Sequence, residues 1–147
     1  MTQPHIVAVS ISDRKGEKKH NISKARLIPD HGLDQDAHAG DWHRQVSLLD
    51  MQSIARIREK GLDVVPGNFA ENITTEGIRL WELPIGTRLQ LGETVIVEVT
   101  QIGKECHNNG CAIKKATGDC IMPREGIFAK VIIEGSVRPG DDIAVLD

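Results

Sequence analysis

Short apolar segments rich in Val and Ile alternate along most of the chain with polar segments that contain Gly, Pro, Asn or Asp. This pattern is typical of β-strands joined by turns. It predicts strands at residues 5–12, 22–28, 46–49, 69–73, 78–80, 87–91, 94–101, 127–134 and 143–146. The tight connection at residues 91–94 indicates a hairpin. About eight to ten short strands favour a closed or partly closed barrel, because closure removes exposed strand edges.

One segment, residues 51–60, has the spacing of an amphipathic helix instead. Asp50 precedes it as a plausible N-cap, and Gly61 follows it as a stop signal. Ile54 and Ile57 fall on one face, while basic residues gather near the C-terminal end, where the helix dipole favours positive charge. Apolar residues at this spacing predict a packing helix and not a cofactor-binding element.

Length and charge narrow the class of protein. The chain has 147 residues, of which 39% are hydrophobic, which predicts one domain covering residues 1–147. A net charge of −3 and 3% aromatic residues argue against a nucleic-acid partner, which requires a broad cationic surface or stacking platforms. The basic run at residues 13–19 is interpreted as a solvated hairpin tip.

Targeting and redox signals predict a cytoplasmic protein with no membrane partner. No segment approaches the roughly 18 apolar residues that a membrane span needs, and the N-terminus lacks the pattern of a signal peptide. The three cysteines form an odd number, which fits a reducing compartment better than a disulfide framework.

All three cysteines, Cys106, Cys111 and Cys120, lie close together in a segment rich in Gly and Asn. Cys106 is the expected nucleophile, because a neighbouring Lys104 or His107 could lower the pKa of its thiol. Alternatively, Cys106, His107, Cys111 and Cys120 could bind zinc, although their spacing fits no paired zinc pattern well. Cys111 and Cys120 could also be small buried apolar residues.

Two further segments carry candidate polar groups. Asp36 and His38 have alternating spacing, so on a strand they would face one side and bind a metal or position a substrate; anchoring a loop is the competing interpretation. Arg124 lies in a turn before an apolar strand, and its forked guanidinium suits a phosphate or a carboxylate.

These three segments, together with Pro-Gly-Asn-Phe-Ala-Glu-Asn-Ile at residues 66–73 and Val-Arg-Pro-Gly-Asp at residues 137–141, resemble the MOSC domain, named for the C-terminal domain of molybdenum cofactor sulfurase. The resemblance covers nearly the whole chain and is strongest to small bacterial stand-alone members. It implies a mainly β fold, a MOSC-like β-barrel with one principal helix and short helical turns. In the family the reactive cysteine follows a strand that ends in Val-x-Gln; here Val-Thr-Gln at residues 99–101 leads to Cys106.

The resemblance also implies a function. Cys106 would act as a thiolate that either carries sulfur as a persulfide or binds the molybdenum cofactor (molybdopterin). Asp36, His38, Asn72 and Arg124 are the polar groups expected around that ligand. Because the chain lacks the pyridoxal-phosphate domain of the sulfurases, we expect a sulfur transferase that works with a separate cysteine desulfurase and a molybdenum-cofactor enzyme. Cys111 and Cys120 could resolve a persulfide by forming a disulfide.

Two alternatives stay open at this point. The first is a non-catalytic zinc-binding or protein-interaction module, in which the cluster Cys106, His107, Cys111 and Cys120 ties down a loop. The second is a Cys-His hydrolase, which is disfavoured because nothing in the sequence marks an oxyanion hole or an orienting partner for His107.

Overall fold

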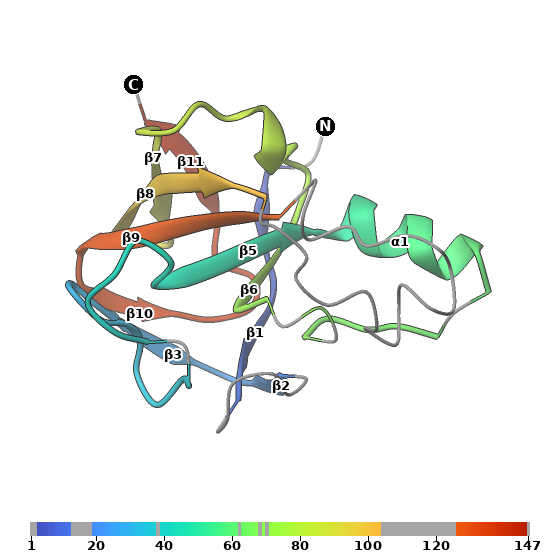
Figure 1. The fold of residues 1–147 in the computed structure, drawn as a ribbon, viewed down its shortest axis with the longest axis horizontal. Coiled ribbons are helices and arrows are strands. Elements are labelled where there is room, and N and C mark those ends of the chain that lie inside the picture. The colour runs from blue at the N-terminus through green and yellow to red at the C-terminus, as the bar shows by residue number, and fades with distance from the viewer. Residues whose placement is uncertain are drawn as a thin grey trace.

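The computed structural model describes residues 3–12, 19–37, 39–61, 63–67, 69, 71–103 and 126–146. Its elements in chain order are β1 (His5–Ile11), β2 (His20–Ile22), β3 (Ala25–Ile28), β4 (Gly32–Leu33), β5 (Val46–Asp50), α1 (Met51–Glu59), β6 (Ile73–Glu76), η1 (Leu80–Glu82), β7 (Arg88–Leu91), β8 (Val95–Ile102), β9 (Ile127–Ile133), β10 (Gly135–Val137) and β11 (Ile143–Leu146). Strands dominate, and α1 extends from the end of β5 to one side of them (Figure 1). The predicted mainly β fold with one principal helix is confirmed. Among the residues that the structure describes, no helix combines the length and the apolar composition that crossing a membrane requires.

Eight strands form a large sheet in the order β11-β7-β8-β9-β5-β6-β1-β2, and three form a small sheet in the order β10-β3-β4. The two ends of the large sheet approach each other where the segment before β11 meets β1. Ile6 donates its backbone N–H to the carbonyl of Asp141 at 2.8 Å, and its own carbonyl accepts from Gly140 at 2.7 Å. His5 and Asp142 form an isolated antiparallel bridge nearby. Among the described residues the strands therefore curl toward closure without forming a continuously paired barrel.

Alternate residues of the large sheet face two different cores, as the two-residue period of a strand requires. Val46 and Leu48 of β5 face the interior core, which also contains Leu27 and Leu33 of the small sheet. The opposite face of β5 packs against α1. The second core lies there and contains Leu49, Ile54, Ile57, Val64, Phe69 and Phe128.

The helix α1 begins and ends as the sequence predicts. Asp50 is the N-cap, and its side chain accepts a hydrogen bond from the backbone N–H of Gln52 at 3.1 Å. Lys60 is the C-cap, and Gly61 follows with a φ of +93°, a left-handed conformation that glycine adopts without strain. The buried Ile54 and Ile57 fix the side of α1 that faces the sheet.

Three of the predicted strands are wrong in part. The strand expected at residues 22–28 is two strands, β2 and β3. Of the strand expected at residues 69–73, only Ile73 belongs to β6, because the carboxylate of Glu71 accepts the backbone N–H groups of Gly67 and Phe69 in the loop before it. Residues 78–80 lead into η1, and the backbone N–H of residue 78 donates to Asp50. In both loops a buried carboxylate takes the N–H groups that strand pairing would use.

The turn at Gly67 supplies a test of this packing. Gly67 has a φ of +97°, and a Cβ there would lie 2.6 Å from the backbone carbonyl oxygen of Lys19. Gly86 has the same φ of +97° but nothing within 4 Å of such a Cβ. We expect Gly86→Ala to cost about 1 kcal/mol of unfolding free energy from the backbone conformation alone. Gly67→Ala adds a backbone clash, so it should cost at least about 1 kcal/mol more in denaturant unfolding. Equal losses for the two variants would contradict the close approach of the two segments.

Candidate functional site

The segment that contains the cysteines leaves and rejoins the sheet at one place. It starts after β8 and returns before β9, where Ile102 pairs with Ile127. Just beyond this pair, the backbone N–H of Gly103 donates to the carbonyl of Gly126 at 2.6 Å. We call this point the base of the cysteine segment. The predicted residues Cys106, His107, Cys111, Cys120 and Arg124, together with His38, lie outside the described residues.

A polar cluster stands at this base. The side-chain oxygen of Gln101 accepts from Arg44 Nε at 3.1 Å, and it lies 2.9 Å from His43 Nε2. Because an amide oxygen only accepts, His43 carries a hydrogen on Nε2 in this contact. The amide nitrogen of Gln101 donates to the carbonyl of Gly103 at 2.7 Å. All hydrogen-bonding atoms of this amide are therefore tied to the base, which fixes its orientation.

The position of Gln101 follows from an irregularity in β8. The register between β8 and β9 shifts between Val99 and Gln101, so that Val99 pairs with Ala129 and Gln101 pairs with Phe128. A bulge of this kind re-aims the side chain that follows it. Val99 faces the interior core, whereas Gln101 stands beside Phe128, which belongs to the core under α1. The hydroxyl of Thr100, the residue within the shift, donates to the carbonyl of His43.

Arg44 is held at the base by two kinds of contact. Its guanidinium carbon lies 5.1 Å from the centroid of the Phe128 ring, a cation–π arrangement, while Nε is bonded to Gln101. Among the described residues, its two terminal amino groups, Nη1 and Nη2, make no hydrogen bond and meet no carboxylate. His43 is exposed, and its ring lies edge-on to Trp42 with 6.0 Å between centroids. The base therefore presents a fixed guanidinium and an accessible imidazole.

A row of residues across the sheet connects this base to one predicted site residue, Asn72. Phe128 pairs with Ser47 of β5. Ser47 exchanges backbone and side-chain hydrogen bonds with Asn72, whose carbonyl accepts from Ser10 of β1 at 2.7 Å. The row thus runs from Gln101 on β8 to Ser10 on β1, on the face opposite the interior core.

Asn72 is fully engaged within this row. Its side-chain oxygen accepts from the backbone N–H of Ser47 at 3.0 Å and from the Ser47 hydroxyl at 3.1 Å. Its amide nitrogen donates to the carbonyl of Ser10 at 3.2 Å, and the residue is 1% exposed. The side chain of Asn72 therefore links β1 and β5 by hydrogen bonds at the start of β6. Its contact with a ligand stays a prediction.

Asp36 belongs to a buried ion pair. Its Oδ1 lies 2.7 Å from Lys19 Nζ, both side chains are 0% exposed, and the same oxygen accepts from the backbone N–H of Ser12 at 3.0 Å. Burial alone raises the pKa of Asp36, but the hydrogen bond and charge of Lys19, with the Ser12 N–H and Asn72, outweigh it, so the pKa is lowered.

The sequence-based interpretation was wrong on two points here. Asp36 lies in a turn region and not on a strand, so the alternation of a strand does not apply to its spacing with His38. Lys19 is not part of a solvated hairpin tip: it is buried, and its Nζ also donates to the Ser12 hydroxyl at 3.3 Å. The high charge of the run at residues 13–19 gave no sign that Lys19 is buried.

Glu71, next to Asn72, is the second carboxylate buried in this region. Burial raises the pKa of its side chain, while hydrogen bonds from the N–H of Gly67, the hydroxyl of Thr74 and the N–H of Phe69 act in the opposite direction. Gly67 N–H and Thr74 Oγ1 donate at 3.0 and 2.8 Å, respectively. Glu71 therefore orders the loop before β6 and is not exposed to a ligand.

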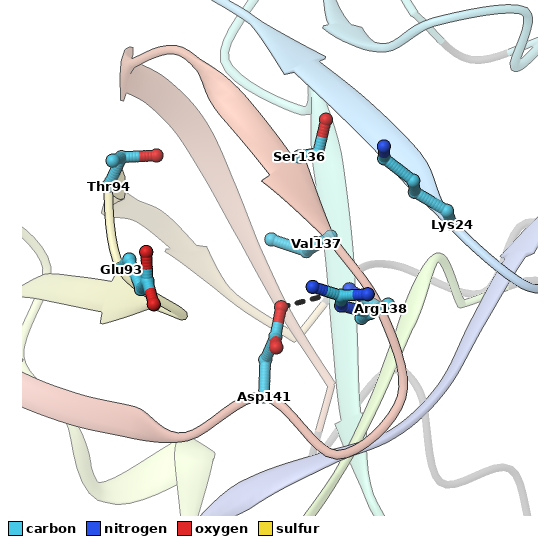
Figure 2. Close-up of a pocket in the computed structure, with 7 residues that line it drawn as sticks. All are labelled: Lys24, Glu93, Thr94, Ser136, Val137, Arg138 and Asp141. Carbon is cyan, nitrogen blue, oxygen red and sulfur yellow. Dashed lines mark hydrogen bonds between the residues drawn. The ribbon is translucent and has the colours of Figure 1, made fainter.

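A separate pocket lies at the other end of β8. It has a volume of about 280 Å³ and is lined by Lys24, Glu93, Thr94, Ser136, Val137, Arg138 and Asp141. Figure 2 shows these side chains around the pocket and the hydrogen bond from the backbone N–H of Arg138 to Asp141, at 3.0 Å. At about 3.3 Å per residue, β8 places Thr94 more than about 20 Å from Gln101, so this pocket does not belong to the base of the cysteine segment. Within the described ranges, no three His, Cys, Asp or Glu side chains group as metal ligands.

The comparison with protein families decides the identity of this fold. The family model of the MOSC domain matches residues 34–144, which is more than half of the chain. The chain belongs to the MOSC domain family. The match includes the base of the cysteine segment and all three cysteines of this MOSC domain, whereas Lys19 lies before it.

Solved structures show the same fold. YuaD from Bacillus subtilis has a TM-score of 0.75 and 18% identity, with 97% of this MOSC domain and 94% of YuaD covered. YiiM from Geobacillus stearothermophilus has a TM-score of 0.69 and 15% identity, with coverage of 98% and 75%. YiiM from Escherichia coli has a TM-score of 0.68 and 18% identity, with coverage of 100% and 71%. A search of curated proteins found no significant match. The predicted MOSC-like fold is thus confirmed.

Sequence reasoning missed the roles of four residues at or near the base of the cysteine segment. His43 and Arg44 lay in a segment noted for its charged residues, but they received no role, and Lys19 was assigned to solvent. Gln101 was noted only as the last residue of the Val-x-Gln pattern. His43 and Gln101 are 58 residues apart, so only the folded chain brings them together.

Proposed function

We propose that this MOSC-domain protein carries sulfur for the molybdenum cofactor as a persulfide on Cys106. The observation that carries the proposal is the position of the base: the segment with all three cysteines joins the sheet beside Arg44 and His43. Cys106 follows Gly103 by three residues, and an extended chain spans at most about 3.6 Å per residue, so their α-carbons are no more than about 11 Å apart. Nearby positive charge favours the thiolate, the nucleophilic form of cysteine.

The proposed transfer balances without an external oxidant. The Cys106 thiolate attacks the outer sulfur of a persulfide on a cysteine desulfurase, the donor's S–S bond breaks, and the donor cysteine leaves as a thiolate. In the second transfer a nucleophile of the acceptor takes the outer sulfur, and Cys106 leaves as a thiolate. The acceptor proposed here is a molybdenum-cofactor enzyme, which agrees with the protein for which the family is named.

The described residues fit an anionic cofactor at the base and not around Asp36 and Asn72. Arg44 and His43 are accessible donors, whereas the side chains of Asp36 and Asn72 are buried and already accept or donate within the protein. When bound, molybdopterin would supply the molybdenum centre that accepts sulfur. The part of Arg124 and His38 in holding it stays a prediction.

The test uses the full chain incubated with radiolabelled cysteine and a cysteine desulfurase. We expect stoichiometric sulfane sulfur on the wild type and none on Cys106→Ser, because serine cannot form a persulfide. Cys111→Ser and Cys120→Ser are the matched controls and should keep the label. Equal labelling of Cys106→Ser, or stoichiometric zinc that survives dialysis and unfolds the protein when chelated, would refute the carrier role.

A further inference from the structure

We infer that Arg44 and His43 form a binding site for a phosphate group at the base of the cysteine segment, with Gln101 as the positioning residue. The inference rests on the proposed function, because it names the part of the ligand that would lie beside Cys106.

Arg44, like Arg58 with the carbonyl of Val64, donates its Nε to a neutral oxygen, whereas three other arginines meet a carboxylate. Arg26, Arg88 and Arg79 each meet a carboxylate, at 2.6, 3.2 and 3.6 Å. Arg44 instead meets the neutral amide oxygen of Gln101, so its positive charge is oriented but not neutralised by this contact. The guanidinium is held through Nε, and its two amino groups make no hydrogen bond to the described residues; two such groups match the forked geometry of a phosphate.

The site is also organised before a ligand arrives. Stacking on Phe128 and the bond to Gln101 hold the guanidinium from two directions, and Arg44 is partly buried. Gln101 cannot turn its amide over, since its nitrogen would then face the N–H groups of both His43 and Arg44 and lose the carbonyl of Gly103. Pre-set donors reduce the entropy lost when a ligand binds.

The experiment titrates the full chain with inorganic phosphate and, separately, with phenyl phosphate while the Arg44 Nε–H signal is followed by NMR. We expect a saturable shift of that signal and, by calorimetry, at least about tenfold weaker binding to Arg44→Gln, the loss expected for one charge-assisted hydrogen bond. Gln101→Glu should weaken binding similarly, since its carboxylate would neutralise Arg44. Arg138→Gln is the control, an exposed arginine at the other end of β8, and should bind as the wild type does.

Each outcome decides a separate point. Stronger binding of phenyl phosphate assigns the site to the phosphate monoester of a larger ligand, and equal or weaker binding assigns it to the free ion. Unchanged affinity in Arg44→Gln, or no shift of the Arg44 signal with either probe, would overturn the inference. If Cys106 takes up sulfur while phosphate fails to bind at Arg44, only this inference falls. If phosphate binds while Cys106 takes up no sulfur, only the carrier function falls.

Discussion

Lys19→Met should lower the free energy of unfolding by about 3–5 kcal/mol, the usual cost of leaving one partner of a buried ion pair without the other. Lys19 Nζ and Asp36 Oδ1 are 2.7 Å apart with both side chains 0% exposed, so solvent cannot compensate for the lost charge. Denaturant unfolding followed by circular dichroism measures the change. Lys19→Met combined with Asp36→Leu removes both charges and should recover most of the loss.

The same pair predicts how stability depends on pH. Because the pKa of Asp36 is lowered in the folded protein from its ordinary value of about 3.8, its ionised form stabilises the fold above that value. This contribution is lost as the pH falls through the lower, folded pKa. The double variant lacks Asp36, so the stability difference between it and the wild type should shift in its favour in acid. A pH-independent difference, or a single Lys19→Met variant as stable as the wild type, would contradict the buried pair.

Asn72→Ala should also cost about 3 kcal/mol or more. It removes the side-chain oxygen that accepts from the backbone N–H and the hydroxyl of Ser47, and the amide that donates to the carbonyl of Ser10. Each lost hydrogen bond of a buried group costs about 1–3 kcal/mol. Asn21→Ala is the matched control: exposed Asn21 accepts one bond from the Ser10 hydroxyl at 2.9 Å, so its loss should cost about 1 kcal/mol or less. Thermal unfolding of both variants gives the comparison.

The two asparagine variants also separate fold from ligand contact. If Asn72→Ala is no less stable than Asn21→Ala but takes up less sulfur or cofactor, Asn72 acts as a ligand residue, as the sequence predicts. If Asn72→Ala is strongly destabilised and its folded fraction takes up sulfur normally, Asn72 has a structural role and links β1, β5 and β6. The hydrogen bonds described above lead us to expect the second result.

Asp36 has a related part in shaping the base. Asp36 contacts Lys19 and Ser12, and the backbone N–H of Ala37 donates to the carbonyl of Ser12 at 2.9 Å. These contacts attach the start of the loop before β5 to Ser12, the residue that follows β1. His43 and Arg44 lie near the end of that loop, separated from β5 by Gln45. The buried pair therefore supports the loop that carries His43 and Arg44, without itself being available to a ligand.

The sequence predicted those parts of the fold in which one local rule decides. Alternation and the turn at residues 91–94 gave the hairpin of β7 and β8, now observed with Leu91 opposite Val95. The N-cap Asp50 and the stop at Gly61 gave α1. The rule failed at residues 69–73, where the apolar pattern is that of a strand but the buried Glu71 draws the backbone N–H groups to itself.

The same distinction holds for the candidate site: a local pattern marks some of its features, and only the folded chain brings the others together. The clustered cysteines, together with the Val-x-Gln pattern that the family resemblance supplied, predicted a site in the segment after β8. No local pattern distinguishes Lys19 from the other lysines of its basic run, because only the tertiary fold places Asp36, 17 residues away, beside it. Likewise the contact of Gln101 with His43 depends on a bulge in β8 and on pairing between distant strands.

The mass of the peptide that contains Cys106, taken after incubation with cysteine and a cysteine desulfurase, tests the central claim most directly. Trypsin cleaves after Lys104 and Lys114, so Cys106 and Cys111 share one peptide and Cys120 falls in another. We expect the shared peptide to gain the mass of one sulfur atom and fragmentation to place that atom on Cys106. An unmodified Cys106, with the added sulfur absent or found on Cys111 or Cys120, would contradict the claim.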